Sequence, residues 1–142
     1  MGLDKNKAYR QKLEQQVTQH ALHARVAFHD FIADTYAVLE EAYAALNFSV
    51  AESFSMTVLE ASGAGVPVIA TASGGPQEII KDGVTGYLIP VGDVDAAAER
   101  MLRLAREPDK AQVMGEAGAE RVRAHFSMQQ LRAQLLQLWG LE

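Results

Sequence analysis

Residues 53–71, SFSMTVLEASGAGVPVIAT, contain a helical pattern that passes directly into a strand pattern. Met56 and Leu59 fall on one helical face, and Gly65 is of the residue type that most often follows the end of a helix. The apolar run 67–71 begins with proline, which strands tolerate at their first residue. A helix followed this closely by a fully apolar strand is typical of α/β proteins, in which both faces of the sheet are covered.

Patterns of the same two kinds alternate along the rest of the chain. Helices are expected at 5–19, 34–43, 53–64, 76–80, 93–106, after 109 and from a capping box at 127–130, and strands at 26–28, 44–49, 67–71 and 87–89. Asp93 is the expected N-cap of the helix that ends near Arg106. Repeated strand–helix units predict a Rossmann-like α/β fold with a mostly parallel sheet and helices on both faces.

The composition is that of a globular domain. Of the 142 residues, 49% are apolar and 22% are charged, which suits one buried core. A net charge of −5 without a basic run argues against nucleic acid or an anionic membrane as a partner. The chain has no cysteine and its four histidines are not grouped as ligands, so no metal site is predicted. We see no signal peptide and no transmembrane segment, and we expect a cytoplasmic location.

Two glycine clusters could suggest a nucleotide cofactor, but their spacing argues against one. Residues 63–65 and 74–76 fit neither the Gly-x-Gly-x-x-Gly fingerprint nor the Walker loop. The sequence therefore contains no motif that indicates an NAD or ATP site. We expect no cofactor.

Two glutamates, Glu52 and Glu60, stand eight positions apart around the start of the predicted helix 53–64. The backbone amides between them, from about Phe54 to Val58, belong to a free helix N-terminus, which attracts anions. We expect Glu52 at the carboxyl edge of the sheet, where open α/β sheets bind ligands. A carboxylate for a sugar, amides for a diphosphate and a second carboxylate for ribose hydroxyls together match a nucleotide sugar. A solvated helix face also explains the pair, since the chain has 18 acidic residues.

Four segments in order carry a family resemblance: 52–61 (ESFSMTVLEA), 65–71 (GVPVIAT), 74–80 (GGPQEII) and 82–88 (DGVTGYL). Together they resemble the C-terminal, donor-binding domain of the group 1 retaining glycosyltransferases, which include glycogen and sucrose synthases and have the two-Rossmann-domain GT-B fold. The resemblance extends from about Val26 to Phe126. It implies transfer of a glycosyl unit from a nucleoside-diphosphate sugar to an acceptor, with retention at the anomeric carbon and without an obligatory metal.

The resemblance implies a role for each matched acidic or loop residue. Glu52 is the implied catalytic residue, which binds hydroxyls of the transferred sugar and positions it near the reacting carbon. Glu60 is implied to hold the ribose hydroxyls. The loop with His29 and Asp30 is implied to lie near the nucleobase through its backbone. Asp30 stands where the family usually has glycine, and aspartate tolerates a left-handed turn better than most residues.

The backbone amides at the helix start are the implied ligands of the donor: Phe54, Ser55 and Met56 for sugar and phosphate, and Thr57 and Val58 for the diphosphate. Ser55 replaces a frequent glycine of the family. The segment 74–78 has two open interpretations. Its amides and Glu78 lie near the donor sugar, or it is only a turn that begins a helix.

The family's domain opens with a strand–helix–strand unit that has no counterpart in this chain. That unit supplies an arginine and a lysine for the diphosphate, and the acceptor-binding domain is missing as well. We therefore expect residues 1–142 to be a single partial domain, the C-terminal half of a GT-B enzyme, that is inactive alone. Loss of the central strands predicts exposed strand edges and apolar surface. The chain is then expected to re-pair its strands or to form a homo-oligomer, such as a strand-swapped dimer.

Three hypotheses about function remain open at this point. The first is the nucleotide-sugar-binding part of a retaining glycosyltransferase. The alternative is a non-catalytic assembly or oligomerisation module that reuses the fold. The third is a related two-domain enzyme, such as a sugar-nucleotide epimerase or a phosphorylase-like protein, against which the combination of Glu52, Glu60 and residues 74–76 argues.

Overall fold

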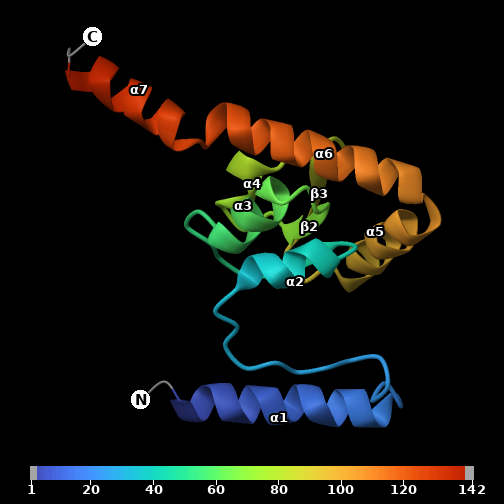
Figure 1. Cartoon of the computed structure of the whole chain (residues 1–142). Helices are drawn as coiled ribbons and strands as arrows, with labels where there is room; N and C mark the ends of the chain where they lie inside the picture. Colours follow the sequence, from blue (N-terminus) through green and yellow to red (C-terminus); the bar gives the residue numbers. More distant parts are fainter. Residues whose placement is uncertain (1–2, 140–142) are drawn as a thin grey trace. The chain divides into compact units, whose positions relative to one another are not determined.

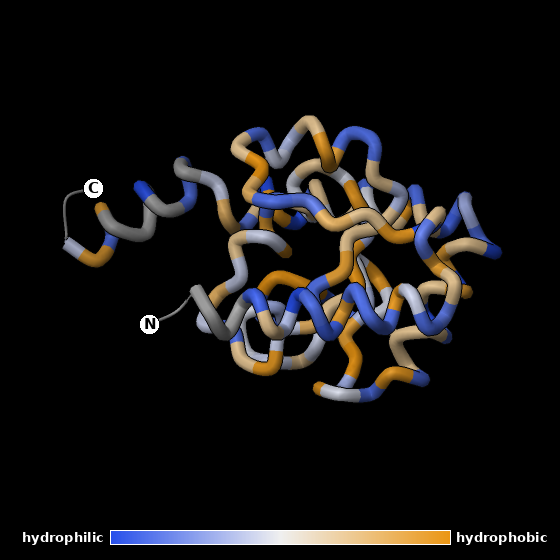
Figure 2. The backbone as a smooth tube through the Cα atoms, turned by 90° about the horizontal axis from the view of Figure 1, so that it is seen from below, coloured by the Kyte–Doolittle hydropathy of each residue, from blue (hydrophilic) through white to orange (hydrophobic). Residues whose placement is uncertain are grey.

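The computed structural model describes residues 3–139. They fall into two compact units, Met1–Ala33 and Asp34–Glu142. The first unit consists of helix α1 (Leu3–Gln19) and an irregular segment (Figure 1). Most of α1 is hydrophilic (Figure 2). The structure has no strand at 26–28, so that prediction was wrong. A strand needs a hydrogen-bonded neighbour, and every strand among the described residues lies in the second unit.

The second unit contains a three-stranded parallel sheet in the order β1-β2-β3. Its strands are β1 (Ala45–Asn47), β2 (Val68–Thr71) and β3 (Gly86–Ile89). In the register of the sheet, Ala45 lies opposite Val68, which lies opposite Gly86. Each strand falls within or beside a range predicted from the sequence, so the prediction of a parallel sheet is confirmed.

Six helices of this unit are described: α2 (Thr35–Glu41), α3 (Met56–Gly63), α4 (Pro76–Ile79), α5 (Val94–Arg106), α6 (Pro108–His125) and α7 (Met128–Trp139). Asp93 is the N-cap of α5, since its Oδ1 accepts from the amide of Ala96 at 2.9 Å. The capping box before α7 forms only in part. Ser127 Oγ accepts from the amide of Gln130, but the Gln130 side chain donates to the carbonyl of Ala124.

The apolar core lies on both faces of the sheet. Val68 and Ala70 of β2 pack with Val58, Ala61, Val66, Ile79 and Ile80, from α3, α4 and the segments next to them. Ile69 of β2 packs with Tyr87, Ile89, Leu104, Ala111 and Met114, from β3, α5 and α6. Successive side chains of a strand point to opposite faces, so the two clusters lie on opposite faces. The predicted Rossmann-like arrangement, with helices on both faces, is confirmed (Figure 1).

Strand β1 forms an edge of the sheet within residues 3–139. Large apolar side chains are exposed on it and beyond its carboxyl end, with Leu46 43%, Phe48 46% and Val50 78% exposed. Together with Val91 and Val94, Phe48 and Val50 line a hollow of about 260 Å³. The predicted exposed strand edge and apolar surface are therefore present. Re-pairing and association with another copy stay predictions.

Arg121 ties α6 to the end of the short helix α4. Its Nε donates to the carbonyl of Ile79 at 2.8 Å, and its Nη2 donates to that of Glu78 at 2.9 Å. We expect Arg121→Met to lower the free energy of unfolding by about 1–3 kcal/mol, because two hydrogen bonds from a charged group are lost. Urea titration followed by circular dichroism measures this. Arg123→Met on the exposed side of α6 is the control, and an equal loss in both variants would contradict the assignment.

Candidate functional site

The start of helix α3 lies beyond the carboxyl end of β1. It begins at Met56 rather than at the predicted Ser53, because Ser55 adopts a left-handed conformation (φ 73°, ψ 80°) that a helix cannot pass through. The first helical hydrogen bond runs from the amide of Leu59 to the carbonyl of Ser55, at 3.1 Å. Among the described residues, the five amides from Phe54 to Val58 have no acceptor. They form a free donor set at the positive end of the helix dipole.

Glu52 is held by the loop that follows β2. Its amide donates to the carbonyl of Ser73 at 2.9 Å, and its carbonyl accepts from the amide of Gly75 at 2.8 Å. Its half-buried carboxylate accepts a hydrogen bond from Ser49 Oγ at 2.7 Å. The backbone and the side chain of Glu52 are thus both fixed, just before the free amides of α3.

Glu60 lies in the second turn of α3, four residues after Met56, which is about 6 Å along the helix axis. It is half-buried, and its Oε2 accepts from Thr35 Oγ1 in the first turn of α2 at 3.3 Å. The two glutamates therefore precede and follow the free amides along the chain. Each carboxylate keeps acceptor capacity beyond its single hydrogen bond.

A polar network at the ends of β1 and β2 was not predicted from the sequence. Asn47 donates from Nδ2 to Ser55 Oγ at 3.1 Å and accepts at Oδ1 from the amide of Ser49 at 3.1 Å. Thr71, which is 2% exposed, donates from Oγ1 to the carbonyl of Ser49. The signal in the sequence was an asparagine inside the apolar strand pattern 44–49. Its importance depends on contacts that the pattern does not show.

The glycine loop between β2 and α4 packs against the segment before α3. Gly74 has φ 117°, a value that favours glycine, and a Cβ there would lie 2.4 Å from the carbonyl oxygen of Glu52. A Cβ on Gly75 would lie 2.2 Å from the carbonyl carbon of Phe54. The loop is also the start of α4, with Pro76 in the first turn, as one of the two interpretations of this segment expected. Glu78 is exposed, and its proximity to a donor sugar stays a prediction.

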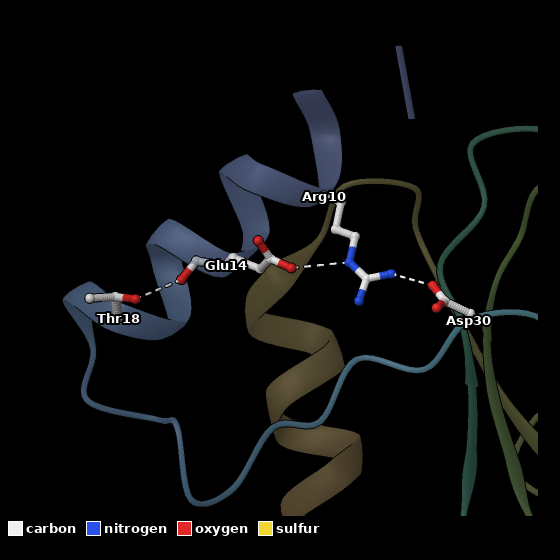
Figure 3. A network of polar contacts seen from close by, with 4 residues as sticks. All are labelled: Arg10, Glu14, Thr18 and Asp30. Atoms are coloured by element: carbon white, nitrogen blue, oxygen red, sulfur yellow. Dashed lines mark hydrogen bonds and ion pairs between the residues drawn. The ribbon is translucent and has the colours of Figure 1, made fainter. Parts of the chain in front are cut away.

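His29 and Asp30 belong to the first unit, where both are exposed. Asp30 Oδ1 accepts from Arg10 Nη1 at 2.6 Å, and Arg10 Nε donates to Glu14 at 3.0 Å (Figure 3). The hydrogen bonds to Glu14 and Asp30 raise the pKa of the Arg10 guanidinium. Among the described residues other than glycine, only Ala21 and Ser55 have positive φ, so the left-handed turn considered for Asp30 does not form. A role of His29 and Asp30 near a nucleobase stays a prediction.

Comparison with known proteins decides the family. The sequence model of the group 1 glycosyl transferases matches residues 1–121 of this chain. The chain belongs to this family. The resemblance seen in the four sequence segments is thereby confirmed.

Solved glycosyltransferase structures match the fold of the chain. The sucrose-phosphate synthase of Thermosynechococcus elongatus is 33% identical with a TM-score of 0.84, and the match covers 94% of this chain and 34% of that one. The C-terminal domain of a group 1 glycosyl transferase from Francisella tularensis is 26% identical with a TM-score of 0.80, covering 87% and 65%. HepE from Anabaena, solved in complex with UDP-glucose, is 24% identical with a TM-score of 0.87, covering 94% and 37%.

The chain corresponds to only a part of the longer members of the family. Its matches cover 10% to 25% of the length of the curated relatives. Across residues 3–139, none of the helices combines the length and the apolar character needed to cross a bilayer. The same residues contain no group of three or more His, Asp or Glu side chains placed to hold a metal ion.

Proposed function

We propose that this chain is the donor-binding part of a retaining glycosyltransferase and binds a nucleoside-diphosphate sugar at the start of α3. The observation that carries the proposal is the set of five free amides, Phe54 to Val58, between two half-buried glutamates. This set lies in a chain of the group 1 glycosyltransferases, and a neighbour of the same fold is known in complex with UDP-glucose.

The chemistry of the site suits the three parts of such a donor. The amides and the helix dipole stabilise negative charge, which grows on the diphosphate as the glycosyl bond breaks. Glu52, fixed by Ser49, accepts hydrogen bonds from hydroxyls of the transferred sugar. Glu60 accepts hydrogen bonds from the ribose hydroxyls. Transfer to an acceptor requires a second binding surface, so we expect no turnover from residues 1–142 alone.

The separate roles of the two glutamates can be tested with ligands that lack parts of the donor. UDP lacks the transferred sugar, and pyrophosphate lacks the ribose as well. We expect Glu60→Ala to lower the affinity for UDP and for UDP-glucose by about 10- to 100-fold, because hydrogen bonds from the ribose to a carboxylate are lost. Binding of pyrophosphate, which has no ribose, stays unchanged in this variant. Glu52→Ala weakens UDP-glucose by a similar factor but leaves UDP unchanged, since UDP lacks the sugar. Isothermal titration calorimetry of the whole chain measures all three ligands.

Glu120→Gln, an exposed position on α6, is the matched control and leaves all three affinities unchanged. Titrations with GDP-mannose and ADP-glucose identify the base. If the chain binds none of these ligands at millimolar concentration, the proposal is wrong. If Glu60→Ala weakens pyrophosphate as much as UDP, Glu60 acts on the helix start and not on ribose.

The exposed edge of β1 favours a second candidate function, an assembly module. Leu46, Phe48 and Val50 offer apolar surface where a further strand can pair. Such a module forms a stable oligomer whose interface covers Glu52 and Glu60. Light scattering tests this, together with the dependence of the melting temperature on protein concentration. A monomer with a concentration-independent melting temperature excludes the candidate.

A further inference from the structure

We propose that Asn47 is a positioning residue of the donor site: it holds Ser55 in the left-handed conformation from which the free amides of α3 project. The inference rests on the proposed function, since it concerns the same amides. It assigns a role to a side chain that the sequence did not single out.

Ser55 is strained where α3 begins. Its φ of 73° lies in the left-handed region, which is unfavourable for a residue with a Cβ atom. Its side chain makes no capping hydrogen bond to the helix, although serine is a common N-cap residue. The side chain is instead turned inward, 6% exposed, and its Oγ accepts from Asn47 Nδ2 at 3.1 Å. The hydrogen bond that keeps Ser55 in place therefore comes from another element.

Asn47 is well placed to provide this hydrogen bond. It is the last residue of β1 and lies opposite Ala70 in the sheet, so its backbone is fixed by β2. Its carboxamide is used at both ends: Oδ1 accepts from the amide of Ser49, and Nδ2 donates to Ser55. One planar group thus spans the connection from β1 to α3. An apolar side chain at this position makes neither hydrogen bond.

The conformation of Ser55 sets the direction of the amides that follow. The peptide after Ser55 carries the amide of Met56, and the amides of Thr57 and Val58 continue from it. Without Asn47, Ser55 is free to relax to negative φ, which reorients that peptide and moves the donors away from a common anion. Glycine adopts positive φ without help. With glycine at position 55, the requirement for Asn47 disappears.

This reasoning predicts an interaction between two substitutions that a merely structural role does not produce. We expect Asn47→Ala to lower the affinity of the parent chain for UDP-glucose at least about fivefold. In the Ser55→Gly background, the same substitution changes the affinity by less than about twofold, whatever affinity that background has. Calorimetry of the parent, of Asn47→Ala, of Ser55→Gly and of the double variant gives the effect of Asn47→Ala on the affinity in each background. Gln112→Ala, which removes an exposed amide bonded to Glu116, is the control and changes nothing.

The melting temperatures of the same four chains give a second, ligand-free measurement. We expect Asn47→Ala to lower the melting temperature by about 3–8 °C in the parent and by about half as much with Ser55→Gly, since only the bond to Ser49 is then lost. If Asn47→Ala does not fold, Asn47→Ser takes its place, because its short hydroxyl cannot span to Ser55 and the same pattern is expected.

The outcomes separate this inference from the proposed function. If UDP-glucose, UDP and GDP-mannose all fail to bind the parent chain, the proposed function is wrong, and the donor-site role of Asn47 with it. If the parent binds but Asn47→Ala has the same effect on affinity in both backgrounds, Asn47 acts through Ser49 or the strand, and the inference is overturned. Equal changes of melting temperature in both backgrounds overturn the coupling of Asn47 to Ser55, with or without a ligand.

Discussion

Gly115→Ala is expected to lower the free energy of unfolding by about 3 kcal/mol or more, the upper end of what overpacking a core costs. Gly115 is buried in α6, and a Cβ added there would lie 1.9 Å from the carbonyl oxygen of Gly65 and 3.2 Å from Pro67 Cδ. The first contact is to backbone, which cannot turn aside as a side chain does. The helix must therefore move away from the loop that leads into β2.

That movement affects both parts of the core, because α6 contributes to each. Ala111 and Met114 pack on one face of the sheet, and Phe126, the C-cap of α6, packs on the other. Urea titration gives the free energy, and Gly63→Ala is the matched control. A Cβ on Gly63 would lie 3.5 Å from Val122 Cγ1, an ordinary contact, and alanine gains up to about 1 kcal/mol over glycine in a helix. Equal stability of the two variants would show that α6 does not pack against Gly65.

Gly75→Ala is expected to damage the candidate site as well as the fold. A Cβ at this position would lie 2.2 Å from the carbonyl carbon of Phe54 and 2.3 Å from its Cα and oxygen. The glycine loop and the segment before α3 must then separate, which breaks the 2.8 Å hydrogen bond from the amide of Gly75 to the carbonyl of Glu52. We expect a loss of about 3 kcal/mol in the free energy of unfolding and at least about tenfold in the affinity for UDP-glucose.

Gly92→Ala separates contact from backbone strain. Gly92 has φ 82° and open space around its Cα, so alanine there carries only the conformational cost of about 1–2 kcal/mol. We expect no change in the affinity for UDP-glucose. Urea titration measures the free energy of unfolding of Gly75→Ala and Gly92→Ala, and calorimetry measures their affinity for UDP-glucose. If Gly75→Ala keeps the parent affinity in the folded protein, the contact between the glycine loop and Phe54 has no part in the site.

Local patterns in the sequence predicted most of the regular structure. Strands were found within or beside the ranges 44–49, 67–71 and 87–89, and Asp93 caps α5 as expected. These features depend on apolar spacing and on short-range hydrogen bonds, which neighbouring residues decide. The prediction of a strand at 26–28 was wrong because it used only the local apolar pattern. A strand also needs a hydrogen-bonded partner, which local pattern does not supply.

Part of the site was also visible in the sequence. The spacing of Glu52 and Glu60 around a helix start was enough to expect free amides between them, and residues 54–58 indeed lack acceptors among the described residues. The start of α3 was misplaced by three residues, because nothing local to Ser55 shows that it is left-handed. The ligands of these groups stay predictions until the donor titrations are made.

The sequence by itself determined the family, the α/β alternation, the Asp93 cap of α5 and the order of the groups that flank the start of α3. Only the tertiary structure decided that Asn47 reaches Ser55, that Gly75 N–H donates to the carbonyl of Glu52, and that Gly115 lies against Gly65. The physical reason is the range of the interactions. Periodicity and capping act within a few residues, whereas these contacts join different elements, whose distances depend on how the strands pair and how the helices pack against them.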